Sequence, residues 1–208
     1  MSADNLAAIR KRLKGTTLIA VSKGHTEQSV REALAAGQRM FGENRVQEAQ
    51  EKFSQLRHDT PDIELHMIGN LQSNKAEEAV QLFDVIETLD RLSLAEALAK
   101  AIKKTGKHPR LYIEINIGNE KQKSGIAPDQ VDDFFATCKK LGLKISGLMC
   151  IPPQHENPRP YFLCMKDLQT RLGLKHLSMG MSGDFETAIE CGATEVRLGT
   201  AIFGKRGK

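Results

Sequence analysis

A lysine stands at the end of an apolar run near the start of the chain, where its amine could act as a nucleophile. Residues 18–21 are apolar, Ser22 and Lys23 follow them, and Gly24 ends the run. An apolar run of this length that closes on a turn residue predicts a buried strand, with the lysine at its carboxyl end. Because an ammonium is costly to desolvate, such a lysine is paired, used chemically, or turned to solvent in the following loop.

Two short segments late in the chain could bind a phosphate. Ser182 to Asp184 is expected to open a helix, whose free N–H groups and dipole favour an anion. Gly199 and Thr200 follow the last predicted strand and offer close backbone approach and a hydroxyl. Each segment alone is better explained by an ordinary helix cap or turn, whereas both together favour phosphate. A lysine amine opposite a phosphate subsite suits a Schiff base with a phosphorylated carbonyl compound, because desolvation and nearby cations lower its pKa from about 10.4 towards ~7–8.

Two buried polar residues have open interpretations. Arg197 lies near the end of the last strand and could face a ring nitrogen or the phosphate, or pair with Glu195 in the barrel wall. His66 lies inside the third predicted strand and could be a base, although a core histidine with one hydrogen bond is the simpler interpretation. Residues 70–75 form a polar stretch that either binds a ligand or caps a helix.

The other groups expected at the ends of the strands are amides, hydroxyls, glycines and carboxylates. They include no pair of histidines with carboxylates, so no metal site is expected there. Three methionines are interpreted as apolar packing near a flat ligand ring, namely Met149, Met179 and Met181.

These residues need a scaffold that gathers strand ends, and the chain predicts one. Strands alternate with helices, and five helices end at a glycine just before the next strand. Eight such repeats favour a single-domain (β/α)8 TIM barrel over residues 1–208; an open doubly wound sheet is the alternative, but no G-x-G-x-x-G follows the first strand. The expected strands are 17–21, 38–41, 63–68, 83–86, 111–117, 143–149, 176–178 and 195–198.

Helix starts are predicted from capping residues. Thr26 is expected to cap a helix over 27–36, and Ser73 a helix near 74–81. Residues 93–96, Ser-Leu-Ala-Glu, resemble a capping box.

Composition limits the class of protein. The chain has 208 residues, 27% of them charged, and a net charge of +4, part of it from the tail at 205–208. Aromatic residues make up only 5%, which supplies base stacking poorly, so no nucleic-acid partner is expected. The four cysteines form no C-x-x-C pair and are expected to be buried free thiols in a reducing compartment. No signal peptide or membrane-spanning run is apparent, which predicts a cytoplasmic protein.

Several motifs together resemble one family. They are Ala-Val-Ser-Lys at 20–23, Phe-Gly-Glu-Asn at 41–44, the stretch 66–75, Ser-Met-Gly-Met-Ser at 178–182 and the stretch 196–204. The chain resembles the YggS/PROSC family of pyridoxal phosphate homeostasis proteins from about residue 17 to 204. That family is similar to the barrel domain of alanine racemase.

The resemblance implies a cofactor and a set of residues that hold it. It implies that Lys23 holds pyridoxal 5'-phosphate (PLP) as an internal aldimine, and that Ser182, Gly199 and Thr200 hold the phosphate. It also implies that Arg197 lies near the cofactor and that Asn44 and Met149 lie near its ring. The implied role is not enzymatic: the protein would carry or buffer PLP in vitamin B6 and amino-acid homeostasis, with PLP-dependent apoenzymes as possible recipients.

An enzyme remains the alternative, either a PLP-dependent racemase or a Schiff-base aldolase. A racemase needs a second base, which an additional domain supplies in alanine racemase-like enzymes and which is not expected here. Tyr112 is predicted in mid-strand and Tyr161 on a helix, so neither is expected at the barrel mouth. For an aldolase, Glu43 and Glu87 are the only obvious acids or bases. Because a closed barrel has no exposed strand edge, a monomer is expected.

Overall fold

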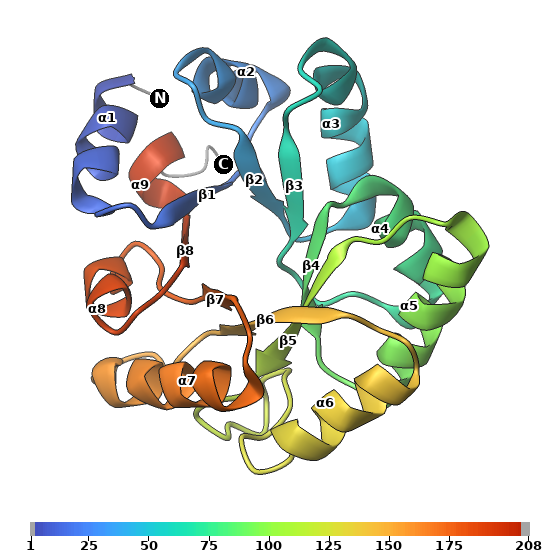
Figure 1. Ribbon diagram of the computed structural model, residues 1–208. Coiled ribbons are helices and arrows are strands. Elements are labelled where there is room, and N and C mark those ends of the chain that lie inside the picture. The colour runs from blue at the N-terminus through green and yellow to red at the C-terminus, as the bar shows by residue number, and fades with distance from the viewer. Residues whose placement is uncertain (1–2, 205–208) are drawn as a thin grey trace.

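Eight parallel strands close into a barrel in the computed structural model, which describes residues 3–204 (Figure 1). Each strand pairs with its neighbours in chain order, and β1 closes the barrel by pairing with β8. The sequence-based expectation of a (β/α)8 TIM barrel is therefore confirmed, and the open sheet is excluded. The strands are β1 (Thr17–Val21), β2 (Met40–Glu43), β3 (Glu64–Met67), β4 (Val85–Leu89), β5 (Arg110–Ile115), β6 (Ile145–Cys150), β7 (His176–Ser178) and β8 (Glu195–Leu198).

The helices surround the strands and cover their outer side (Figure 1). In α5 the residues at helical spacing are buried, including Leu94, Leu98 and Ala101, so one face packs on the barrel. The helical elements are α1 (Ala3–Arg12), α2 (Glu27–Ala35), α3 (Val46–Asp59), the 3₁₀ turn η1 (Ser73–Lys75), α4 (Ala76–Leu82), α5 (Leu92–Thr105), α6 (Val131–Lys140), α7 (Arg159–Leu172), α8 (Phe185–Glu190) and α9 (Thr200–Phe203).

Some predicted helix ends are confirmed. The Thr26 hydroxyl accepts a hydrogen bond from the Ser29 N–H at 3.3 Å and caps α2. Gly106 and Gly173 end α5 and α7 with φ of 70° and 65°, a conformation that costs glycine little because it has no Cβ.

Other local predictions were wrong because tertiary contacts set the boundary. The expected capping box at 93–96 is absent, since α5 begins at Leu92 after Arg91, whose guanidinium bonds the Leu71 carbonyl at 2.7 Å. Strand β4 begins at Val85, two residues later than expected. The carboxylate of Asp84 accepts the Leu65 N–H at 2.8 Å, so the residue before β4 holds the neighbouring strand β3 instead.

The thiol and membrane expectations can be compared with the described residues. All four cysteines are free; Cys138, Cys150 and Cys191 are buried as expected, but Cys164 on α7 is exposed. Within residues 3–204, no helix combines the length and apolar character that crossing a bilayer needs. The basic tail at 205–208 lies outside the described residues.

Candidate functional site

A cavity of about 250 Å³ opens at the carboxyl end of the strands. It brings together six of the seven residues named as cofactor-binding, although they come from four different strand ends. Its walls also include five residues that were not named as cofactor-binding, and one of them, Met181, was expected to pack near a ligand ring. The lining residues are Val21, Lys23, His25, Asn44, Ile68, Ile151, Met181, Ser182, Arg197, Gly199 and Thr200.

Lys23 lies in a tight turn directly after β1. The His25 N–H donates to the Ser22 carbonyl at 3.0 Å, and Gly24 has φ of 69° between them. Because a residue with a side chain rarely adopts that φ, the glycine makes the turn possible. The lysine is half-buried and lines the cavity, which excludes a side chain turned wholly to solvent.

Asn44 follows β2 and places an amide at the cavity. Its Oδ1 atom is buried and has no hydrogen-bond partner among the described residues. The loop after β3 passes very close, since a Cβ on Gly69 would lie 2.4 Å from the Asn44 carbonyl oxygen. An acceptor that is buried without a donor is costly, so this amide suits a ligand that brings a donor.

The predicted phosphate segments lie on the same cavity but differ in detail from the expectation. Ser182 does not open a helix: α8 begins at Phe185 and has only six residues. The Asp184 carboxylate accepts the Met181 N–H at 2.6 Å, which folds the segment into a turn. Gly199 precedes the four-residue helix α9, and Thr200 is its first residue. Anion binding here would therefore depend on hydroxyls and loop N–H groups, with little helix dipole.

Arg197 on β8 lines the cavity, and its guanidinium is bonded to groups of β6 and β7. Its side chain is 4% exposed; Nη1 donates to the Ser178 hydroxyl at 2.7 Å and Nη2 to the Cys150 carbonyl at 2.8 Å. The Glu87 carboxylate lies 3.8 Å from Nη1. The charge partner is thus Glu87 on β4, whereas the pairing with Glu195 that the sequence left open is not seen.

Met149 is the one predicted binding residue that does not line the cavity. It is 1% exposed and packs with Val85 and Tyr112 inside the barrel. The apolar groups at the cavity are instead Ile68, Ile151 and Met181, and the last two are more than one third exposed. Met181 was expected near a ligand ring, whereas Ile68 and Ile151 were not, because an apolar residue at a strand end or in a loop carries no signal of its own for binding.

Comparisons with known proteins give the family of the chain. The family model described as "Alanine racemase, N-terminal domain" matches residues 2–207. The chain belongs to this family. The similarity to the barrel domain of alanine racemase is thereby confirmed, and the relatives reported next confirm the resemblance to the pyridoxal phosphate homeostasis proteins.

Several members have names or structures that bear on the site. The pyridoxal phosphate homeostasis protein of Aquifex aeolicus is 41% identical over 199 residues, which covers 91% of this chain and 86% of that protein. The one from Escherichia coli K12 is 38% identical and covers 98% and 96%. PipY from Synechococcus elongatus, solved with PLP bound, has a TM-score of 0.88 and 39% identity and covers 97% and 99%. An alanine racemase from Clostridium difficile, 16% identical with a TM-score of 0.73, shows the fold alone.

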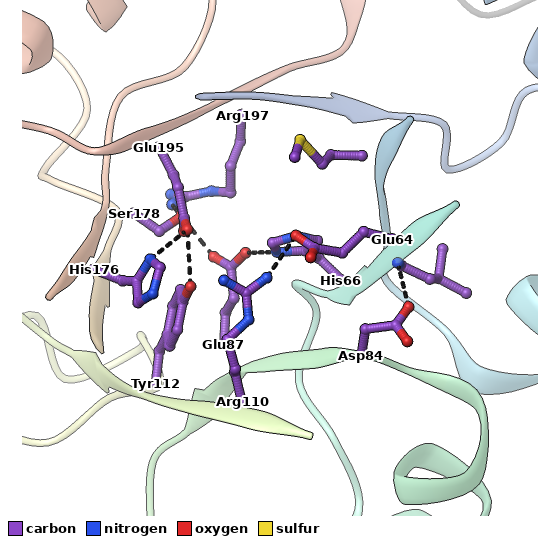
Figure 2. Close-up of polar contacts among 12 residues, drawn as sticks. Glu64, His66, Asp84, Glu87, Arg110, Tyr112, His176, Ser178, Glu195 and Arg197 are labelled. Carbon is purple, nitrogen blue, oxygen red and sulfur yellow. Dashed lines mark hydrogen bonds and ion pairs between the residues drawn. The ribbon is translucent and has the colours of Figure 1, made fainter. Parts of the chain in front are cut away.

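Below the cavity, the barrel of this family member contains a network of charged side chains (Figure 2). His66 lies 2.6 Å from Glu87 through Nδ1 and 2.9 Å from Glu64 through Nε2. The expectation of a single hydrogen bond was wrong. Burial alone would lower the pKa of His66, but the bonds to Glu64 and Glu87 raise it to about 9. The hydrogen bond from His66 in turn lowers the pKa of Glu64 to about 2.

Glu195 forms the other half of this network. Its Oε1 accepts the Tyr112 hydroxyl at 2.8 Å and lies 3.0 Å from His176 Nδ1. No metal site was predicted at the mouth. Within residues 3–204, a group at ligand spacing lies in the interior, where single atoms of His66, Glu87 and Glu195 lie within 4.8 Å of one another. Both nitrogens of that histidine already face carboxylates, so neither could bind a metal without breaking one of these contacts.

Proposed function

We propose that this protein binds PLP as a Schiff base on Lys23 and serves intracellular PLP and amino-acid homeostasis without turning over amino acids. One observation carries the proposal: a single cavity collects a lysine amine, a buried guanidinium and the hydroxyls of two loops. These are the groups that an aldehyde, a pyridine ring and a phosphate would require. The bound PLP in PipY, which is 39% identical, supports the choice of cofactor.

Each group has a part in holding the cofactor. Lys23 would hold the aldehyde carbon of PLP through its amine as a Schiff base, with the aldehyde oxygen released as water. Ser182 and Thr200 donate hydroxyls to the phosphate, and Gly199 lets the backbone approach it. Arg197 would lie near the ring, and Met149 would support that side of the site from the barrel interior. Asn44 Oδ1 accepts a donor from the ligand, which would relieve its lack of a partner.

An amino-acid racemase-like enzyme is the competing function. It needs an acid or base facing the cofactor in addition to the lysine. The Tyr112 hydroxyl is committed to Glu195 inside the barrel, and the Tyr161 hydroxyl lies 2.5 Å from Glu156 at the surface. His25 lines the cavity but is stacked on Phe203, with ring centroids 4.9 Å apart. This arrangement favours retention of PLP, with negligible turnover.

The proposal extends to the compartment, the oligomeric state and the partners of the protein. We place it in the cytoplasm as a monomer, with PLP-dependent apoenzymes as recipients. Four free cysteines suit a reducing compartment. The closed barrel leaves no strand edge for a second chain to pair with.

The adduct is the first thing to test. Purified protein is incubated with PLP, reduced with borohydride, digested and analysed by mass spectrometry. We expect the reduced adduct on Lys23 and its loss in Lys23→Ala. Lys104→Ala is the matched control, since that lysine is exposed and pairs with Glu77 at 2.8 Å on the outer helices. An adduct on another lysine, or none, would refute the proposal.

Turnover separates the homeostasis protein from the enzyme. The PLP-loaded protein is incubated with single L- and D-amino acids, and chirality and product formation are followed over hours. We expect rates no higher than those of free PLP. Racemisation or decarboxylation that disappears in Lys23→Ala would establish the enzyme instead.

A further inference from the structure

We propose that Lys52 is a positioning residue for Lys23, which it holds through the two peptide groups that flank it. The inference rests on the proposed function, because it concerns how readily the Lys23 amine reaches the PLP aldehyde. Lys52 belongs to α3, does not line the cavity, and was not singled out in the sequence.

The ammonium of Lys52 is almost fully buried and uses all three of its donors. The side chain is 7% exposed. Nζ donates to the Ser22 carbonyl at 2.8 Å, to Glu43 Oε1 at 2.7 Å and to Glu48 Oε1 at 3.1 Å. An ammonium has three N–H groups, so its hydrogen-bonding capacity is filled.

These contacts fix the backbone on both sides of Lys23. The Ser22 carbonyl belongs to the peptide group before the lysine, and Lys52 bonds it directly. The Gly24 N–H belongs to the peptide group after the lysine and donates to Glu48 Oε1 at 2.6 Å. Because Glu48 is itself bonded to Lys52, one buried ammonium holds both peptide planes and thus the direction of the Lys23 side chain.

The third contact explains why a buried charge is present at this place. Glu43 is fully buried on β2 and accepts the Ser22 hydroxyl at 2.7 Å beside Lys52. Burial raises its pKa although Lys52 acts in the opposite direction. A buried ion pair contributes little net stability compared with apolar packing, whereas fixing a conformation is a known use of such pairs. The cluster of Ser22, Glu43, Glu48 and Lys52 therefore fits an ordering role at the Lys23 turn.

This role has a distinctive consequence. The protein groups proposed to bind the phosphate lie in the loops after β7 and β8. Lys52 bonds Ser22, Glu43 and Glu48 and none of these groups. Loss of Lys52 should therefore weaken the step that depends on Lys23 and leave phosphate and ring binding nearly unchanged. A general loss of structure would weaken both.

The experiment compares two ligands on wild type and Lys52→Met. PLP can form the Schiff base, and 4'-deoxypyridoxine 5'-phosphate has the same phosphate and ring without the aldehyde. For the variant we expect the dissociation constant of PLP to rise about 10-fold or more, with slower growth of the Schiff-base absorbance band. The constant for the analogue should stay within about twofold. An unchanged PLP constant, or equal weakening of both ligands, would overturn the inference.

Controls keep the outcome decisive. Lys104→Met removes an exposed lysine and should change neither ligand. If Lys52→Met does not fold, Glu48→Ala serves instead, because Glu48 is about one third exposed and its loss frees the Gly24 N–H. Glu48→Ala should raise the dissociation constant of PLP about 3-fold and leave that of the analogue unchanged. Equal changes in the two constants would overturn the inference. Wild-type protein that binds the analogue but forms no adduct would instead refute the proposed function itself.

Discussion

The mouth and the interior of this barrel both contain polar groups, but the interior groups are mostly charged and paired with one another, whereas the mouth presents hydroxyls and an amide. In the interior, His66 bonds two carboxylates, and Glu87 lies between it and Arg197 (Figure 2). Three carboxylates, Glu64, Glu87 and Glu195, lie with three cations, His66, Arg110 and Arg197. At the mouth, the cavity is lined by hydroxyls and by the Asn44 amide, whose oxygen has no partner among the described residues.

The difference indicates how one fold separates stability from binding. Charges inside the barrel are tolerated because they are paired, so removing one partner is expensive. Polar groups at the mouth sit in loops that the barrel holds in place, and replacing one should leave the barrel intact. Arg197 belongs to both regions, since it lines the cavity and is anchored by the interior.

The largest expected effect is on the interior. Glu87→Ala leaves His66 and Arg197 without their shared, fully buried carboxylate, so we expect a loss of about 3–5 kcal/mol in the free energy of unfolding. Denaturant unfolding measures it, and Glu87→Gln, which keeps the shape and one acceptor, should lose less. A loss below about 1 kcal/mol would show that the interior pairs are not a connected network.

A pH titration sharpens the same point. The pKa of His66 is raised from 6.5 to about 9, so the stability it contributes is fully present below pH 6.5 and is lost as the pH rises through 9. The shift corresponds to about 3 kcal/mol. Denaturant unfolding at about pH 6 and about pH 9.5 should show wild type losing that much more than His66→Gln over this interval. Parallel curves for the two proteins would mean that His66 is neutral in the folded barrel.

The smallest effect on stability is expected at the mouth. Thr200→Val removes an exposed hydroxyl and should change the free energy of unfolding by no more than about 0.5 kcal/mol. Thr200→Val should raise the dissociation constant of PLP about 10-fold, which corresponds to the loss of one hydrogen bond to a charged group. Thr137→Val, which removes a hydroxyl bonded to the Asp133 carbonyl on α6, is the control. Unchanged PLP binding in Thr200→Val would remove this hydroxyl from the phosphate site.

The mouth was easier to predict from sequence than the interior, for a physical reason. Lys23 comes just after the apolar run 18–21, and Gly199 and Thr200 follow the short predicted strand 195–198, so their place at a strand end can be inferred locally. In a barrel all such ends meet at one face, which brings them together whatever the register. Met149 shows the limit, because alternation along β6 turns its side chain into the interior.

The interior network depends on information that no single segment contains. His66, Glu87 and Glu195 lie on β3, β4 and β8, and only the stagger of the closed barrel brings their atoms within 4.8 Å. The Lys52 contacts could not be predicted from one segment either, because a lysine on a helix is normally expected to face solvent. Its partners Ser22 and Glu43 come from two different strand ends.

The most direct test of the account is a crystal structure of the protein after incubation with PLP and borohydride reduction. The account predicts continuous density from Lys23 Nζ to the cofactor and its phosphate against Ser182, Gly199 and Thr200. It also predicts that the His66 contacts to Glu64 and Glu87 stay as they are. Cofactor bound elsewhere, or an interior whose ion pairs break when the mouth is filled, would contradict the separation of the two regions.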